Sequence, residues 1–235
     1  MDLNAAAQLG IKVARVPSYS PEAVAEFTVG MMLTVIRKYH KAYNRVREGN
    51  FLLDGLMGFN LSGKTVGLIG TGQIGLLTGK MLSKGFGCTV IAYDPYPSIA
   101  AAEHGIVYVD ALEELFTRSD IISLHCPLNK DTDYIINDNT LSLTKKGVIL
   151  INTSRGGLID TYALIRYVKI LSGPFIYTFL IQNNTKSALK SGHVSAVGLD
   201  VYERESSYFF ADSSAKVIAD DSFARLLSFY NVFMT

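Results

Sequence analysis

The chain has 235 residues, of which 49% are hydrophobic and 18% charged, and its formal net charge is +1. Its 22 basic and 21 acidic side chains are spread along the chain rather than gathered in blocks. This balance does not favour nucleic acid or an anionic membrane as a partner, and it favours a small neutral or anionic ligand. The length predicts one globular domain over residues 1–235, a common size for an α/β fold.

The N-terminal residues lack the basic start and the long apolar run of a secretory signal. The longest uncharged apolar stretch, residues 170–182, is shorter than the roughly 20 residues that a membrane-spanning helix needs. Cys88 and Cys126 lie in apolar runs without a CxxC spacing or clustered histidines, which predicts buried free thiols and no metal site. We therefore expect a cytoplasmic protein in a reducing compartment.

The first strong element is one long helix, predicted over residues 21–48. Ser20 is the expected N-cap, Pro21 occupies the first helical position, and Gly49 ends the helix. Apolar positions that recur at helical spacing, and so predict its buried face, include Val24, Phe27, Met31 and Val35.

Six short β-branched runs follow, separated by helix-patterned segments. They cover residues 65–70, 89–94, 106–109, 120–126, 147–153 and 195–201. Near-continuous apolar strands that alternate with helices indicate a parallel sheet covered on both faces. The fold class predicted is therefore α/β, with a doubly wound parallel sheet.

The stretch VGLIGTGQIG places Gly70, Gly72 and Gly75 in a G-x-G-x-x-G pattern after a strand and at the start of a helix. Gly70 permits the tight turn, Gly72 lets a pyrophosphate approach the backbone, and Gly75 brings the helix close to the strand. Asp94, at the end of the next strand, would accept hydrogen bonds from a ribose diol and repel a 2′-phosphate, which favours NAD over NADP. The alternative is a glycine-rich turn without a ligand.

Polar residues also follow two later strands. Thr153, Ser154 and Arg155 come just after one strand, and Asp200, Glu203 and Glu205 come at the end of another. Ligands bind at the carboxyl edge of open α/β sheets, where a guanidinium can clamp a substrate carboxylate and an acid can orient a catalytic group. The alternative is a structural Arg–Glu ion pair.

Six blocks together resemble a known family. They are VARVPSYSPEAVAE, GKTVGLIGTGQIG, VIAYDPYP, SDIISLHCPL, GVILINTSRGGLIDT and AVGLDVYERE. In this order they resemble the NAD-binding domain of the D-isomer-specific 2-hydroxyacid dehydrogenases, most closely the D-lactate dehydrogenases. The resemblance implies a Rossmann-type domain and reversible hydride transfer between NADH and a 2-oxo acid such as pyruvate.

The resemblance also implies roles for single residues. Arg155 would bind the substrate carboxylate and carbonyl, Glu205 would pair with the catalytic histidine, and Asp200 would face the nicotinamide carboxamide. Positions expected at the cofactor are Gln73 and Ile74 at the pyrophosphate, Asp94 at the adenosine ribose, and Cys126, Pro127, Thr132, Thr153 and Ser154 along its length. The helix at 21–48 packs between subunits in family dimers, so the resemblance implies a homodimer.

Two departures concern the ends of the chain. The family's catalytic histidine follows the strand that matches residues 231–235, and a substrate-domain half precedes the crossing that matches the start of this chain. None of His40, His104, His125 and His193 matches the missing histidine. We expect NAD binding with little turnover by these 235 residues. The alternative is a non-catalytic remnant that binds NAD(H) or a partner protein.

A third departure is an insertion of residues 167–187 into a helix of the matched pattern, where Gly173-Pro174 would break the helix. The hypothesis is a translated intron, because the segment interrupts the match cleanly and Val168-Lys169 can be encoded by codons that start with a splice-donor-like sequence. The alternative is a genuine extra loop.

Overall fold

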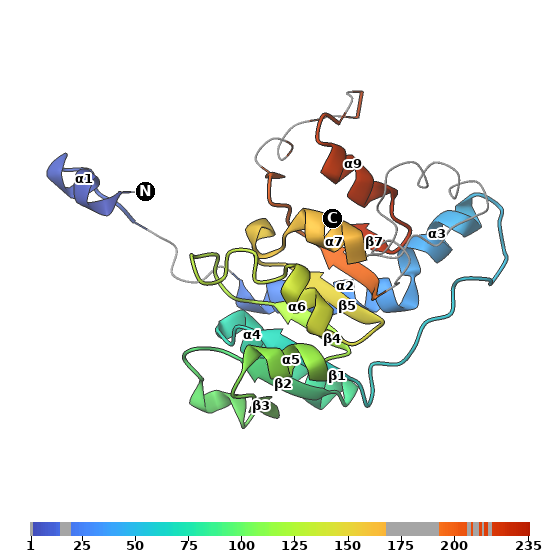
Figure 1. Ribbon diagram of the computed structural model, residues 1–235, viewed down its shortest axis with the longest axis horizontal. Helices are drawn as coiled ribbons and strands as arrows, with labels where there is room; N and C mark the ends of the chain where they lie inside the picture. The colour runs from blue at the N-terminus through green and yellow to red at the C-terminus, as the bar shows by residue number, and fades with distance from the viewer. Residues whose placement is uncertain are drawn as a thin grey trace.

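Figure 1 shows the computed structural model, which describes residues 2–14, 20–167, 193–205, 208, 212, 214–215 and 218–235. A seven-stranded sheet forms its centre, with the order β3-β2-β1-β4-β5-β6-β7, and every neighbouring pair of strands is parallel. This order reverses direction between β1 and β4. The doubly wound α/β fold predicted from the sequence is confirmed.

The strands lie close to the predicted apolar runs. They are β1 (Thr65–Ile69), β2 (Thr89–Tyr93), β3 (Ile106–Tyr108), β4 (Ile121–Leu124), β5 (Val148–Asn152), β6 (Val194–Leu199) and β7 (Val232–Met234). All residues of β4 and β5 are buried, as in a parallel sheet that is covered on both faces.

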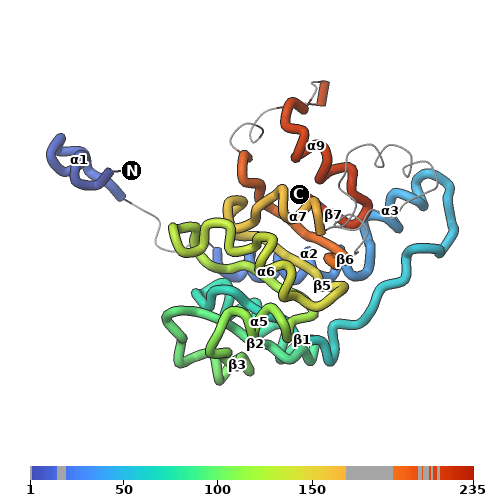
Figure 2. The backbone as a smooth tube through the Cα atoms, in the orientation of Figure 1, coloured from blue at the N-terminus to red at the C-terminus, as the bar shows by residue number. Residues whose placement is uncertain are grey.

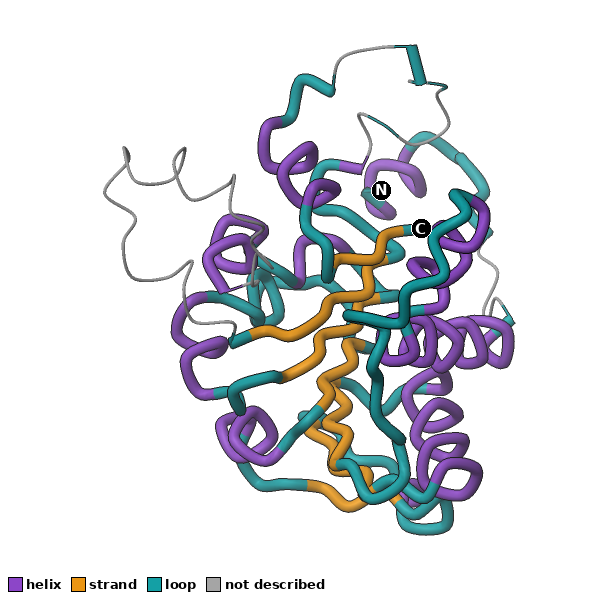
Figure 3. The backbone as a smooth tube through the Cα atoms, turned by 90° about the vertical axis from the view of Figure 1, so that its right-hand side faces the viewer, coloured by secondary structure: helices purple, strands orange, loops and turns teal. Residues whose placement is uncertain are grey.

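Helices cover both faces of the sheet (Figure 3). One face is covered by α2 (Pro21–Arg37), by α4 (Gln73–Lys80) and by the π-helical turn η1 (Met81–Gly85) that continues α4. The other face is covered by α5 (Leu112–Arg118), α6 (Asp138–Leu143), α7 (Thr161–Tyr167) and α9 (Asp221–Ser228). The remaining helical elements are α1 (Leu3–Gln8), α3 (Tyr39–Arg47) and the 3₁₀ turns η2 (Ile99–Ala101) and η3 (Gly156–Leu158).

Alternate residues of the central strands enter two hydrophobic clusters, one on each face. Val66 and Leu68 of β1 pack with Met32 of α2, whereas Ile69 packs with Leu115 of α5 on the other face. Gly67 lies where α5 crosses β1, because a Cβ there would overlap the side chains of Ser119 and Leu115. The two clusters hold the sheet rigidly, so its carboxyl edge is a fixed platform.

The predicted helix over residues 21–48 is wrong in one respect, because the chain breaks it into α2 and α3. Lys38, between the two helices, takes left-handed backbone angles of φ 56° and ψ 38°. Gly49, with φ +73°, follows α3 as predicted. The change of direction between α2 and α3 is visible in the backbone tube (Figure 2).

Two further expectations for this segment are also corrected. Ser20 precedes α2, but its side chain makes no capping hydrogen bond and its φ is 39°. Phe27 is 44% exposed, whereas Met31 and Val35 are buried. The buried stripe of α2 therefore includes the predicted Met31 and Val35 but leaves out Phe27; its other buried residues are Ala25, Thr28, Val29, Met32 and Ile36.

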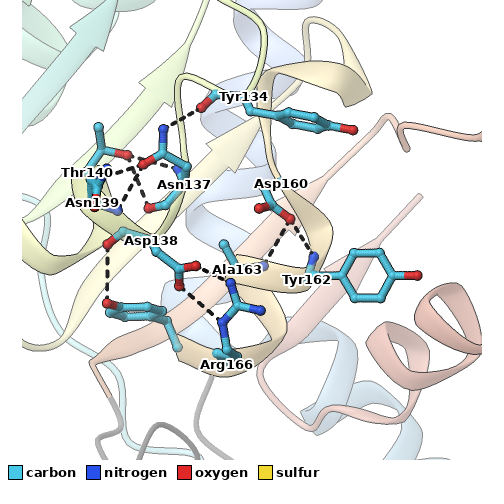
Figure 4. A network of polar contacts seen from close by, with 10 residues as sticks. Tyr134, Asn137, Asp138, Asn139, Thr140, Asp160, Tyr162, Ala163 and Arg166 are labelled. Carbon is cyan, nitrogen blue, oxygen red and sulfur yellow. Dashed lines mark hydrogen bonds and ion pairs between the residues drawn. The ribbon is translucent and has the colours of Figure 1, made fainter.

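Local hydrogen bonds fix the start of α6 and of α7 (Figure 4). Asn137 and Thr140 form a reciprocal capping box at α6. Asp160 accepts hydrogen bonds from two amides in the first turn of α7, at 2.9 and 3.1 Å. Arg166 of α7 forms an ion pair with Asp138 of α6, which ties the two helices together.

Cys88 and Cys126 are free and buried, as predicted. Among the described helices, none combines the length and the apolar character needed to cross a bilayer. Apart from Tyr167 at the end of α7, the predicted insertion 167–187 lies outside the described residues, and so does its Gly173-Pro174 pair.

Candidate functional site

The predicted site residues gather at the carboxyl edge of the sheet, because all the strands are parallel. Five strands, β1, β2, β4, β5 and β6, end next to Gly70, Asp94, His125, Thr153 and Asp200 respectively. The order of strands reverses between β1 and β4 at this edge. Ligands of open α/β sheets bind at such a switch point.

The glycines of the phosphate loop have the geometry that the motif predicts. Gly70 has φ +98°, and a Cβ there would lie 2.7 Å from the backbone nitrogen of Cys126. A Cβ at Gly75 would overlap the carbonyl oxygen of Gly70, so only glycine lets α4 approach β1 this closely. Gly72, in contrast, has open space around its Cβ position.

The amino end of α4 completes the cradle. Gly72 is the N-cap of α4 and, as a glycine, has no side chain with which to cap the helix. Gln73 and Ile74 form the first turn, where backbone N–H groups point out of the helix. Open space beside Gly72 and a glycine at the N-cap position fit a pyrophosphate, the group for which such cradles are built.

Asp94 stands beside this loop and is held in place by it. One of its carboxylate oxygens accepts hydrogen bonds from the Thr71 amide at 2.7 Å and the Thr71 hydroxyl at 3.0 Å. The Thr71 hydroxyl also lies 2.7 Å from the Tyr108 hydroxyl, which accepts from the Ser98 amide at 2.8 Å. Thr71 and Tyr108 therefore orient the carboxylate that is predicted to meet a ribose.

Cys126 links the phosphate loop to the next strand end. Its carbonyl accepts a hydrogen bond from the Ser154 hydroxyl at 2.8 Å, which joins the loop after β4 to the loop after β5. Burial, with a smaller contribution from the charge of Asp94, raises the pKa of the Cys126 thiol to about 11. The thiol is therefore protonated at neutral pH and has no thiolate reactivity.

Arg155 lies in a turn that Asn152 shapes. The Asn152 side chain is buried, donates to the Arg155 carbonyl at 2.9 Å and accepts from the Ser154 amide at 3.0 Å. The Arg155 side chain is exposed, and its guanidinium donates to the Ser154 carbonyl at 2.7 Å. Among the described residues it forms no salt bridge, so the alternative of a structural Arg–Glu pair finds no support there.

The Thr153 side chain is held in place by a contact with helix α2. Its hydroxyl lies 2.8 Å from the hydroxyl of Thr28, which is fully buried on α2 and donates to the Val24 carbonyl at 2.8 Å. Gly156 then passes so close to the Tyr202 carbonyl that a Cβ would overlap it. The turn that carries Arg155 thus packs against the segment that carries the acidic residues.

The acids of this segment have separate surroundings. Asp200 accepts from the Thr235 hydroxyl at 3.0 Å, and its pKa is raised by burial and by the charge of Glu205, against that hydrogen bond. Glu205 accepts from the Tyr202 amide at 3.2 Å. Glu203 instead accepts from the Thr161 hydroxyl at 3.1 Å and contacts Arg204 at 3.6 Å, which gives it a structural role.

The remaining predicted cofactor positions lie in the loop after β4. Thr132 donates from its hydroxyl to the Pro127 carbonyl at 2.6 Å and also accepts from the Asn129 amide at 2.9 Å. These bonds fold the loop back on itself next to the carboxyl edge. Pro127 and Thr132 therefore have fixed positions in this largely exposed loop.

The four histidines have different surroundings, and all four lie in the described part of the chain. His125 Nε2 is 2.9 Å from the Ser123 hydroxyl, and desolvation lowers the His125 pKa to about 4. His193 Nε2 is 2.9 Å from the Thr144 hydroxyl, and His104 lies in a turn before β3. His40 belongs to α3, and its ring contacts that of Phe233 at a tilt of 38°. Among the described residues, no group of three or more His, Cys, Asp or Glu is arranged to hold a metal ion.

Comparison with known families decides the relationship of this chain. Residues 29–170, more than half of its length, match the family described as D-isomer specific 2-hydroxyacid dehydrogenase, NAD binding domain. The chain belongs to this family. NAD is the cofactor after which the family's domain is named, and the resemblance stated from the six sequence blocks is confirmed.

The relatives described next align with this chain over its full length. D-lactate dehydrogenase of Escherichia coli K12 is 48% identical over 235 residues, which are 100% of this chain and 64% of that protein. The structure described as the pyruvate reductase of Chlamydomonas reinhardtii has a TM-score of 0.84 and 43% identity over 100% of this chain and 64% of its own. D-lactate dehydrogenase of Aquifex aeolicus, complexed with NAD and lactic acid, has a TM-score of 0.78 and 36% identity over 100% of this chain and 65% of its own. This chain therefore spans less than two thirds of each relative.

Sequence reasoning missed three residues of this dehydrogenase domain. Thr71 and Tyr108 orient Asp94, and Asn152 shapes the turn at Arg155. Asn152 had a usable signal, since an asparagine that ends an apolar strand often folds its side chain onto the following turn. The contact between Thr71 and Tyr108 joins the phosphate loop to β3, and no local pattern predicts such a pairing.

Proposed function

We propose that this chain is the cofactor-binding part of an NAD-dependent oxidoreductase that interconverts a 2-oxo acid such as pyruvate and the corresponding D-2-hydroxy acid. The observation that carries the proposal is the arrangement at one sheet edge: a glycine cradle at the start of α4, an oriented carboxylate at Asp94, and the Arg155 turn. NADH, when bound, supplies the hydride. The residues of this chain bind and orient the cofactor and the substrate.

The phosphate cradle is assigned to Gly70, Gly72 and Gly75, with Gln73 and Ile74 presenting the first turn of α4 to the pyrophosphate. Asp94 is assigned to the ribose hydroxyls. Its negative charge would repel a 2′-phosphate, which favours NAD over NADP. The residues assigned along the cofactor towards the nicotinamide are Cys126, Pro127, Thr132, Thr153, Ser154 and Asp200.

Arg155 is assigned to the substrate carboxylate, and Glu205 to the orientation of a catalytic imidazole. The exposed Arg155 guanidinium donates only to a neighbouring carbonyl, so most of its N–H donors face outward. Such a group forms paired hydrogen bonds with a carboxylate. Glu205 lies close enough to Asp200 to raise its pKa, so the two acids share one region of the edge.

We also propose that the 235 residues alone turn over slowly. His125 is the histidine at the carboxyl edge, but it stays neutral and is engaged with Ser123. The other histidines lie away from Arg155, on α3, before β3 and before β6. A general acid contributes about 10²- to 10⁴-fold to the reaction rate. Without such an acid near Arg155, NADH binding would stay largely intact and the reaction would be slow.

The test is a pair of measurements on the purified chain. NADH binding is followed by nicotinamide fluorescence, and NADH oxidation is followed with pyruvate present. Saturable NADH binding with oxidation at least a hundredfold below that of a full-length relative is expected. Binding without any Arg155-dependent response to the pyruvate analogue oxamate would favour the non-catalytic remnant.

A matched pair of variants separates the substrate role from general effects. Arg155→Met is expected to leave NADH affinity within about threefold and to abolish the oxamate-dependent change in NADH fluorescence. Arg118→Met, which removes an exposed arginine from a surface pair with Glu114, is the control and should keep both signals. Equal loss in both variants would contradict the assignment of Arg155.

We further propose a homodimer through the segment that was predicted as helix 21–48. Large apolar side chains are exposed along this segment; they include Phe27, Tyr39, Tyr43 and Val46. Analytical ultracentrifugation should give twice the monomer mass, and Val46→Asp should lower it. A monomer at 50 μM wild-type chain would refute the dimer.

A further inference from the structure

A small cavity lies at the other edge of the sheet, where the break between α2 and α3 meets the amino ends of β6 and β7. It has a volume of about 60 Å³. Its polar lining consists of Lys38, His40 and Lys41 from the helix break, Ser195 from β6, and Tyr230 and Asn231 from the residues before β7. The space fits a group of a few heavy atoms, and it is separate from the cofactor edge.

The charges around this cavity are all of one sign. Lys38, Lys41 and Arg45 follow one another at helical spacing, and like charges at such spacing repel each other. Burial, followed by the charges of Lys38 and Arg45, lowers the pKa of Lys41 to about 7. Within the described part of the chain, none of the three forms a salt bridge with an acid. The cluster therefore lacks a counter-charge.

Two buried polar atoms beside the cavity, one ring nitrogen of His40 and the side-chain oxygen of Asn231, have no hydrogen-bond partner among the described residues. The other His40 ring nitrogen bonds to the Thr34 backbone. The Asn231 amide is oriented by its nitrogen, which donates to the Ser195 carbonyl at 3.0 Å. Buried polar groups in folded proteins nearly always have partners, so these atoms point to a bound group.

The surrounding side chains are already held in place. Lys38 has the left-handed backbone that breaks the helix, and its ammonium donates to the Gly55 carbonyl at 2.7 Å. Arg45 donates to the carbonyls of Leu52 and Asp54, at 3.0 and 2.6 Å, and lies 3.5 Å from the Tyr230 hydroxyl. Lys41 lies over the Tyr230 ring. Backbone strain that is retained under such constraint is typical of binding sites.

We propose that this cavity binds a phosphate group, with Lys41 as the direct donor and Lys38 and Arg45 supplying the surrounding positive charge. A phosphate supplies the acceptor that the Lys41 ammonium lacks among the described residues. A monoprotonated phosphate also supplies a proton for the Asn231 oxygen. The phosphate is either inorganic or the end of a small phosphomonoester.

Isothermal titration calorimetry tests the site on the whole chain. Inorganic phosphate is titrated at fixed pH and fixed ionic strength, with and without saturating NADH, and glycerol 2-phosphate is titrated in parallel. One saturable phosphate site that persists with NADH is expected, because the cavity lies away from the cofactor edge. Tighter binding of glycerol 2-phosphate would assign the site to a phosphomonoester.

Variants identify the cavity. Lys41→Met should weaken phosphate binding at least tenfold, Lys41→Arg should weaken it less than threefold, and Lys84→Met, which removes an exposed lysine from η1, should leave it unchanged. Binding that survives Lys41→Met, binding that NADH abolishes, or no binding at 20 mM phosphate would overturn the proposal. Phosphate-independent self-association that is lost in Lys41→Met would instead assign the cavity to a second copy of the chain.

Discussion

Glycines 72 and 75 allow the phosphate cradle to be tested separately from the fold. Gly72 has φ −64° and open space around its Cβ position, so Gly72→Ala introduces no clash. Alanine restricts the unfolded chain, which adds about 0.4–1 kcal/mol of stability, but it is a poorer N-cap than glycine by a similar amount. We therefore expect a net change in the free energy of unfolding within about 0.5 kcal/mol.

The same methyl group would occupy the space into which a pyrophosphate must fit. NADH affinity should therefore fall at least tenfold, which corresponds to about 1.4 kcal/mol. Gly75→Ala differs, because its methyl would overlap the Gly70 carbonyl oxygen inside the fold. Overpacking of this kind costs about 1–3 kcal/mol, and the better helix propensity of alanine returns about 1 kcal/mol.

The two variants are compared by thermal unfolding and by NADH fluorescence titration. Gly75→Ala should lower the unfolding midpoint by up to roughly 8 °C and weaken NADH binding, whereas Gly72→Ala should weaken binding alone. Gly30→Ala, on an exposed position of α2 with open space around it, is the control and should not weaken NADH binding. If Gly72→Ala binds NADH as well as the wild type, no phosphate approaches the backbone there.

Three further outcomes are expected. Asp94→Asn removes the charge that opposes a 2′-phosphate, so the ratio of NADPH to NADH affinity should rise at least tenfold; an unchanged ratio in fluorescence titrations would remove Asp94 from the ribose site. Asn152→Leu breaks both hydrogen bonds that shape the Arg155 turn, which should cost about 2–3 kcal/mol in urea unfolding, against less than about 0.5 kcal/mol for Asn139→Leu at an exposed asparagine of α6; equal losses would contradict this role. Because His125 has a folded-state pKa of about 4 against an ordinary value near 6.5, the unfolded chain binds more protons between these values. The free energy of unfolding should therefore fall by about 2–3 kcal/mol as the pH drops from 6.5 to 4, and a slope unchanged in His125→Asn would refute this source.

The sequence was sufficient for the sheet because parallel strands buried on both faces are apolar without interruption. Val148 to Ile151 is such a run, and it forms most of β5. The phosphate loop was equally readable, since Gly70 and Gly75 are required by backbone geometry that no other residue allows. Features fixed by the backbone leave a local signature.

Features that depend on tertiary contacts left no local signature in the sequence. The helix break at Lys38 has no glycine or proline to announce it, and the side chain is held by the distant Gly55 carbonyl. The short π-helix that follows α4 also lacks a sequence signal. Spacing likewise did not reveal that Glu203 bonds to Thr161 whereas Glu205 turns towards Tyr202.

A crystal structure of the chain with NADH is the measurement that bears most directly on the cofactor site. The account predicts that the pyrophosphate lies at the amino end of α4 beside Gly72, and that the adenosine ribose hydroxyls lie within hydrogen-bond distance of the Asp94 carboxylate. NADH bound elsewhere on the chain, or no density for it from crystals grown at millimolar NADH, would contradict the account.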